Sequence, residues 1–130
     1  MPVCEQYGIS MYVHPDDPPF SLFGLPRIVT SEEDIDWILQ AVNNNHNGLT
    51  FCAGSLSAGL HNNVPALAQK FASRTKFVHL RSTYVYPDGN FIEASHLEGR
   101  GRLIEVIRIF EKENPALPMR VDHGRLMLDD

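Results

Sequence analysis

The residues best suited to chemistry in this sequence are four side chains of metal-ligand type, each at the end of a short apolar run. They are His14 in MYVHP, Cys52 in LTFCAG, His79 in KFVHLR and Asp122 in MRVDHG. Parallel α/β sheets and barrels build their active sites from side chains at the carboxyl ends of their strands. Four such endings, spaced widely enough for strand-plus-helix units, predict one shared metal site.

The donor atoms of this set indicate which ions it would hold. Imidazole nitrogens, a thiolate and a carboxylate suit a divalent transition ion such as Mn²⁺, Fe²⁺, Co²⁺ or Zn²⁺, and argue against Ca²⁺ or Mg²⁺. Taken singly, each residue has a simpler explanation. A histidine after a strand is more often a hydrogen-bonded structural residue, and a lone cysteine is more often a small buried hydrophobe. Their joint placement favours the metal site.

His123, next to Asp122, is the candidate for proton transfer. The backbone can twist at a strand end, so Asp122 can bind the metal while His123 stands beside it as a general acid or base. The alternative is a loop histidine that hydrogen-bonds the local backbone. His46 and His61 lie in polar loop sequence and receive no functional assignment.

Arg81 and Ser82 lie just beyond the third apolar run and are candidates for substrate binding. They are placed to hold an anionic group such as a substrate carboxylate. The alternative for Arg81 is a salt bridge to Asp16 or Asp17. These aspartates belong to a long proline-rich loop, residues 14–29, whose apolar side chains need packing partners. We expect this loop to cover the site, with a subunit contact as the main alternative.

The elements that position these residues alternate between strand and helix. Thr30 with Glu33 fits a capping box for a first helix, and Asn62 or Asn63 can cap a second. A turn is expected at residues 87–89. The order of elements predicts parallel strands with right-handed crossovers. Strands are predicted at residues 9–14, 49–52, 76–80 and 119–122, and helices at residues 31–44, 62–73 and 102–112.

Side-chain alternation along the strands agrees with the proposed ligand set. If the four ligands point to one face, nine apolar residues point to the other face, as a covering helix layer requires. The ligand face otherwise carries mostly polar residues. The nine are Ile9, Met11, Val13, Leu49, Phe51, Val78, Leu80, Met119 and Val121.

The composition is that of an ordinary globular protein and excludes several classes. A net charge of −5 without a Lys/Arg cluster argues against nucleic-acid binding. No apolar run has the length of a membrane span, and MPVCEQYGIS at the N-terminus is not a signal peptide. Two cysteines in such a chain indicate reduced thiols and a cytoplasmic location.

The 130 residues are predicted to form a single partial domain. A (β/α)8 barrel takes about 250 residues, so four strand–helix units amount to half of one. Residues 2–8 read as the end of a helix, and the chain stops at Asp129-Asp130, where a further helix should begin. Open edges on four parallel strands predict self-association, most simply as a homodimer.

Five segments together resemble one enzyme family over essentially the whole chain. They are HPDDPPFSLFGLPRIV, TFCAGS, FVHLRST, EASHLEG and PMRVDHGRLMLDD. They are similar to the carboxyl-terminal half of mannonate dehydratase, whose members are (β/α)8 TIM barrels related to xylose isomerase. HPDDPP followed by GLPRI, and the DHG-x-x-MLDD ending, are specific to that family.

The resemblance implies a hydro-lyase that dehydrates D-mannonate to 2-dehydro-3-deoxy-D-gluconate in glucuronate breakdown. It implies Mn²⁺ or Fe²⁺ as cofactor, with the family's metal ligands falling on His14, Cys52, His79 and Asp122. The family's acid/base histidine falls on His123. A second acid/base residue, a tyrosine past the DHG motif, has no counterpart before the chain ends. We therefore expect little or no dehydratase activity from these 130 residues alone.

Three other interpretations remain open at this point. Another metal-dependent sugar enzyme of the same barrel type, such as an aldose–ketose isomerase, is disfavoured by the cysteine ligand. An inactive remnant of a truncated or split gene would bind metal without turnover. A plain structural half-barrel would bind no metal at all.

Overall fold

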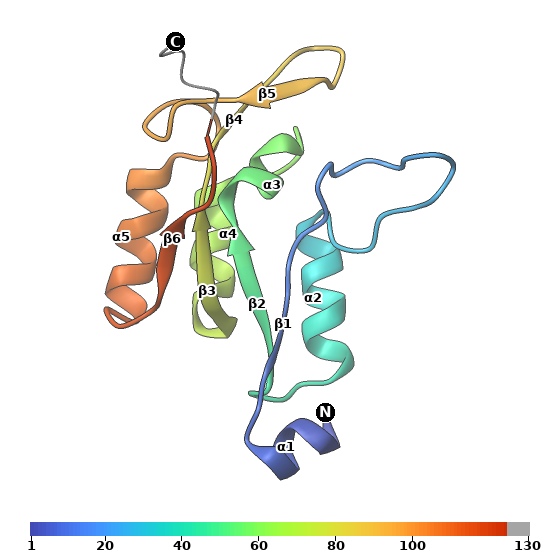
Figure 1. Cartoon of the computed structure of the whole chain (residues 1–130), viewed down its shortest axis with the longest axis vertical. Coiled ribbons are helices and arrows are strands. Elements are labelled where there is room, and N and C mark those ends of the chain that lie inside the picture. Colours follow the sequence, from blue (N-terminus) through green and yellow to red (C-terminus); the bar gives the residue numbers. More distant parts are fainter. Residues whose placement is uncertain (125–130) are drawn as a thin grey trace.

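The centre of the computed structural model is a four-stranded parallel sheet, and residues 1–124 are described (Figure 1). Neighbouring strands follow the order β1-β2-β3-β6, and each of the three pairings is parallel. The predicted parallel α/β sheet is confirmed. The MLDD ending and the helix expected after it lie outside the described residues. The strands are β1 (Met11–Val13), β2 (Asn47–Cys52), β3 (Thr75–Leu80) and β6 (Met119–Val121).

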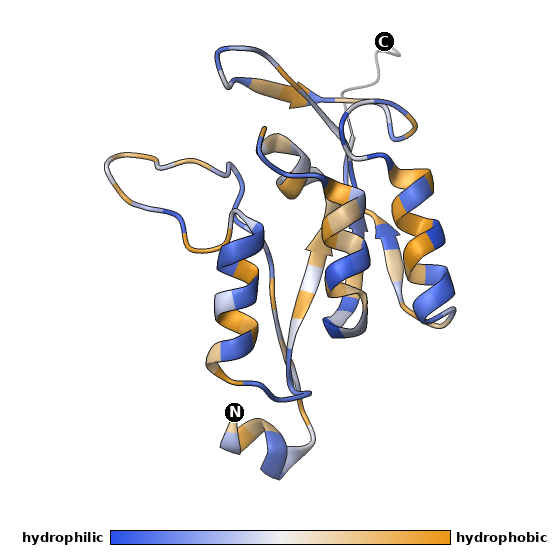
Figure 2. Cartoon of the chain, turned by 180° about the vertical axis from the view of Figure 1, so that it is seen from behind, coloured by the Kyte–Doolittle hydropathy of each residue, from blue (hydrophilic) through white to orange (hydrophobic). Residues whose placement is uncertain are grey.

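Three amphipathic helices lie on the same side of this sheet and enclose the core (Figures 1 and 2). They are α2 (Glu32–Ala41), α4 (Val64–Phe71) and α5 (Leu103–Glu113). Leu49, Phe51 and Val78 from the two central strands are fully buried in this core, as side-chain alternation predicted. Phe51 meets Phe110 of α5 edge to face, with ring centroids 5.1 Å apart. Apolar burial between the sheet and these helices is the main stabilising term.

The two edge strands depart from the predicted packing. Ile9, Met11 and Val121 were expected beneath a helix layer, but they are 52%, 63% and 60% exposed. The central strands have a paired neighbour on both sides, whereas β1 and β6 each pair on one side only among the described residues. No described helix covers the outer part of these edges, so apolar side chains there stay in contact with solvent.

Helix starts follow capping chemistry, although one predicted cap was wrong by one residue. The box at α2 joins Ser31 and Asp34 rather than Thr30 and Glu33. Asp34 Oδ2 accepts hydrogen bonds from the Ser31 N–H at 3.0 Å and from the N–H and hydroxyl of Thr30, both at 2.9 Å. Both pairs fit the same spacing rule, and the short Asp34 side chain satisfies three donors at once. Asn63 caps α4, which confirms one of the two predicted residues.

One buried helix and one β-hairpin were not predicted. Helix α3 (Ala53–Ala58) follows β2 directly, and all of its residues are buried. Its sequence, AGSLSA, has no amphipathic period, so nothing in the pattern indicated a helix. Strands β4 (Thr83–Val85) and β5 (Phe91–Glu93) form an antiparallel hairpin around the predicted turn at residues 87–89.

The remaining elements agree with the sequence or are short. Helix α1 (Pro2–Tyr7) ends at Gly8, whose φ of 63° gives the left-handed C-cap that glycine favours. A short 3₁₀ turn, η1 (Ala72–Arg74), leads into β3. Among the described residues, none of the helices has both the length and the apolar character needed to cross a membrane.

Candidate metal centre

Three of the four predicted ligands converge at the carboxyl end of the sheet. His14 directly follows β1, Cys52 is the last residue of β2, and His79 lies near the end of β3. One ligand atom from each lies within 4.8 Å of the others. His14 Nε2 and His79 Nδ1 are 3.2 Å apart, and Cys52 and His79 are direct partners in the strand register. The topology therefore brings together residues that are far apart in the sequence.

Asp122 lies beside this cluster, on the far side of His79 from Cys52. It follows β6 directly, and its Oδ2 is 3.8 Å from His79 Nδ1. Because β6 pairs with β3, the two side chains come from neighbouring parallel strands. The structure thus places all four predicted ligands at one end of the sheet, with Asp122 contacting His79.

The electrostatics of Cys52 favour a thiolate. Burial raises the pKa of this thiol, but hydrogen bonds from the His14 side chain and from Ser55 outweigh burial and lower it. The hydrogen bond with Cys52 in turn raises the pKa of His14, against an opposing effect of burial. A cysteine binds a metal ion as the thiolate, so this environment suits ligation.

The pKa of His79 is lowered, whereas that of His14 is raised. Burial lowers the His79 pKa, nearby His14, Arg120 and His123 lower it further, and the Asp122 carboxylate opposes them. A neutral imidazole is the form that coordinates a metal ion. One thiolate, two imidazoles and an adjacent carboxylate therefore fit a divalent transition ion, as the sequence predicted.

His123 stands at the rim of the cluster with both ring nitrogens near carboxylates. Its side chain is 57% exposed, and its Nε2 lies 3.5 Å from Asp122 Oδ2. Its Nδ1 lies 3.8 Å from Glu93 Oε2 at the end of β5. Sequence reasoning missed Glu93, because a glutamate ending a short strand carries no signal without its partner.

Arg81 and Ser82, predicted to contact substrate, are almost completely buried. Arg81 is 4% exposed and forms ion pairs with Asp17 and Glu93, so the salt bridge to Asp17 weighed as an alternative is present. Ser82 Oγ donates to the Glu98 carbonyl at 2.5 Å and accepts from the Gly101 N–H at 2.9 Å. Both side chains are engaged in bonds within the protein.

The proline-rich loop is ordered by Asp16, the other aspartate considered for Arg81. Asp16 Oδ2 accepts hydrogen bonds from the N–H groups of Ile28 and Val29, both at 2.7 Å, which ties the two ends of the loop together. Phe20 then packs on Phe91 of β5, with ring centroids 6.3 Å apart. The loop and the β4–β5 hairpin therefore meet at the end of the sheet that carries the ligands (Figure 1).

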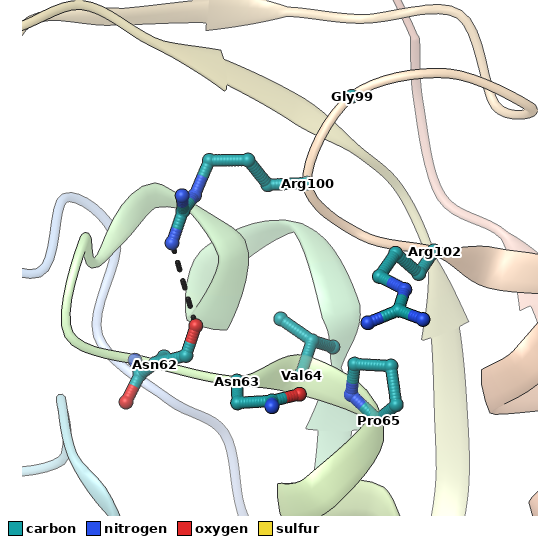
Figure 3. A pocket seen from close by; sticks show the side chains of 7 residues that line it. All are labelled: Asn62, Asn63, Val64, Pro65, Gly99, Arg100 and Arg102. Atoms are coloured by element: carbon teal, nitrogen blue, oxygen red, sulfur yellow. Dashed lines mark hydrogen bonds between the residues drawn. The ribbon is translucent and has the colours of Figure 1, made fainter.

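A separate cavity of about 290 Å³ lies between the start of α4 and the segment before α5 (Figure 3). Asn62, Asn63, Val64, Pro65, Gly99, Arg100 and Arg102 line it. Arg100 donates to the carbonyls of Ser57, Leu60 and Asn62, and Arg102 pairs with Glu105. Both arginines thus have partners within the protein, and no predicted site residue lines this cavity.

Comparison with known proteins decides the family. The family model for D-mannonate dehydratase (UxuA) matches residues 1–130. The chain belongs to the D-mannonate dehydratase family. Mannonate dehydratase 2 of Agrobacterium fabrum is 46% identical over 100% of this chain and 35% of that protein. Mannonate dehydratase of Saccharophagus degradans is 44% identical over the same two shares.

A solved member of the mannonate dehydratase family shares the fold. The crystal structure of mannonate dehydratase from Streptococcus suis serotype2 matches with a TM-score of 0.91 and 34% identity. The match covers 99% of this chain and 38% of that one. This chain thus spans about a third of the length of the mannonate dehydratases it matches. The predicted fold class, a part of a (β/α)8 barrel with parallel strands, is confirmed.

Proposed function

We propose that this chain supplies the metal-binding part of a mannonate dehydratase, the hydro-lyase that converts D-mannonate to 2-dehydro-3-deoxy-D-gluconate. The observation that carries the proposal is the convergence of His14, Cys52 and His79 ligand atoms within 4.8 Å in a chain of this family. Asp122 completes the proposed ligand set, and Mn²⁺ or Fe²⁺ is the proposed ion. One thiolate in the set disfavours a sugar isomerase of the same barrel type.

The proposed reaction removes water across two neighbouring carbons of the sugar acid. The proton at C2 is acidic because it lies next to the carboxylate, whereas hydroxide at C3 is a poor leaving group. A bound Lewis-acidic ion would stabilise negative charge that develops on substrate oxygens. One side chain takes the C2 proton and another protonates the departing hydroxide.

His123 is the proposed acid or base of this chain. Its ring is exposed to solvent at the rim of the ligand cluster, so a substrate beside the metal can reach it. Carboxylates of Asp122 and Glu93 lie within 4 Å of opposite ring nitrogens, at 3.5 and 3.8 Å. The two carboxylates thus flank the ring on opposite sides and can orient it toward the substrate.

The proposal extends to partners and compartment. The substrate is a small sugar acid, with no nucleic acid or membrane involved, and the chain pairs with another copy through its open edges. A cytoplasmic location follows because a cysteine ligand must remain reduced, and both cysteines are free.

Metal binding and ligand binding test the proposal together. Protein purified without chelator should contain manganese or iron by elemental analysis, and a Cys52→Ala variant should not. After loading with Co²⁺, D-mannonate should change the visible absorption spectrum, whereas a neutral aldose should leave it unchanged. Absence of metal in both proteins would contradict the proposed site. Equal responses to both sugars would favour an isomerase, and metal binding without any sugar response would favour an inactive remnant.

A further inference from the structure

Arg81 lies behind the ligand cluster and joins two carboxylates that are distant in the sequence. It follows β3, two residues after His79, and its side chain is 5% exposed. Its Nε donates to both carboxylate oxygens of Glu93, at 2.9 and 3.0 Å, and its Nη2 donates to Glu93 Oε1 at 2.6 Å. Its Nη1 donates to Asp17 Oδ2. The planar guanidinium holds both carboxylates with a fixed fork of N–H donors, a geometry that a lysine ammonium does not supply.

The absence of a side chain at Gly54 leaves room for the Arg81 side chain. A Cβ built on Gly54 would lie 2.5 Å from both Cγ and Cδ of Arg81, closer than real contacts allow. Gly54 belongs to α3, the short helix that starts from Cys52. The stem of Arg81 is therefore clamped against the segment that carries a proposed ligand.

One arm of this cluster reaches the proposed thiolate ligand. Asp17 Oδ2 and Cys52 Sγ both lie 3.2 Å from Ser55 Oγ, and the Ser55 N–H also donates to the Cys52 sulfur at 3.4 Å. Arg81 forms an ion pair with Asp17, and Asp17 accepts a hydrogen bond from the Ser55 hydroxyl, which also contacts the Cys52 sulfur. A chain of polar contacts thus runs from Arg81 to Cys52.

The other arm reaches the proposed acid or base. Glu93, held by three short contacts from Arg81, lies 3.8 Å from His123 Nδ1. Since Glu93 ends β5, its hydrogen bonds from Arg81 also connect the hairpin to the end of β3. A single guanidinium thus contacts both carboxylates, one leading to Cys52 and the other to His123.

The charges disfavour a direct role for Arg81 in substrate binding. One guanidinium faces two carboxylates, so the cluster is net negative and would repel a third carboxylate from the substrate. We propose that Arg81 is a positioning residue, which acts through Asp17 and Ser55 on Cys52 and through Glu93 on His123. This inference rests on the proposed function, because it assumes that Cys52 binds metal.

The test compares variants by Co²⁺ binding, read as the thiolate-to-cobalt charge-transfer band of Cys52. Arg81→Met and Arg81→Lys should each weaken Co²⁺ and Mn²⁺ binding by about 10- to 100-fold, the usual effect of groups that orient metal ligands. Both should shift or weaken the charge-transfer band. Asp17→Asn leaves the Arg81 side chain packed against Gly54 and should change the band in the same way. Glu93→Gln, on the other arm, should change the band less than Asp17→Asn does, because Glu93 does not contact Ser55 or Cys52 in the chain of contacts above.

Arg100→Met is the matched control, since Arg100 also bonds internally, to three backbone carbonyls away from the ligands. It should lower the free energy of unfolding without altering the band. If Arg81→Met does not fold, Arg81→Lys and Asp17→Asn carry the test. Unchanged affinity and an unchanged band in folded variants would overturn the positioning role. No cobalt binding by the unsubstituted chain would instead overturn the proposed metal site itself.

Discussion

Cys52 and His79 face each other as direct register partners on the parallel strands β2 and β3. Neighbouring strands lie about 4.8 Å apart, so two side chains at paired positions on the same face come within reach of one ion. Cys52 is also the N-cap of the short helix α3, and the Ser55 N–H donates to its sulfur. Because of this pairing, substitution of either residue should weaken metal binding.

Cys52→Ser should weaken Mn²⁺ binding by more than about 100-fold, because it removes a ligand rather than a group that orients one. Competition with a chelator measures the affinity. Cys4→Ser is the control: Cys4 is also buried, but it lies in α1, away from the cluster. Equal affinities for the two variants would rule out Cys52 as a ligand.

Asp34→Asn should reduce the free energy of unfolding at neutral pH by about 1 kcal/mol, as loss of a helix cap usually does. Burial raises the pKa of Asp34, but hydrogen bonds from Thr30 and Ser31 outweigh it and lower the pKa. A lowered folded-state pKa means that the stabilisation is present above the unfolded pKa and is lost as pH falls through the folded one.

The difference in free energy of unfolding between Asp34→Asn and the unsubstituted chain should therefore shrink as pH falls below about 4. Urea unfolding at several pH values measures it. Glu33→Gln, in the same helical turn but exposed, should have little effect at any pH. A difference that stays constant down to low pH would contradict the assigned cause.

Phe110→Ala should destabilise the chain by about 3–5 kcal/mol, because it leaves a cavity opposite Phe51 in the centre of the core. The urea midpoint should fall, and near-ultraviolet circular dichroism should weaken. Phe23→Ala provides the contrast, since Phe23 is 99% exposed and its loss should leave the midpoint unchanged.

Met11→Lys and Val121→Lys should each reduce self-association. Both residues are more than half exposed on the edge strands, and a charge on an edge strand opposes pairing with another chain. Light scattering at several protein concentrations gives the mass. Trp37→Lys removes a 71% exposed apolar residue from helix α2 rather than from an edge strand, and should not change the mass. A monodisperse monomer before any substitution would refute edge-driven association.

The sequence alone determined the parallel α/β class, the approximate strands and helices, and the ligands to expect at the strand ends. These features are local, because an apolar run, a capping residue and a ligand type are read within a few positions of one another. Thus the strand endings alone predict His14, Cys52 and His79 as ligands, and the structure brings their ligand atoms together. The cap at Ser31 was missed by one residue, since two neighbouring pairs satisfied the same local rule.

The tertiary structure alone decided what surrounds those ligands. Arg81 and Asp17 are 64 positions apart, and Ser55 and Asp17 are 38 apart, so no local pattern reports their contacts. Glu93 reaches His123 only because the hairpin folds over the end of the sheet. The exposure of Met11 and Val121 likewise depends on which strands have a neighbour. Local chemistry selects the elements, whereas long-range packing sets the partner, burial and charge environment of each side chain.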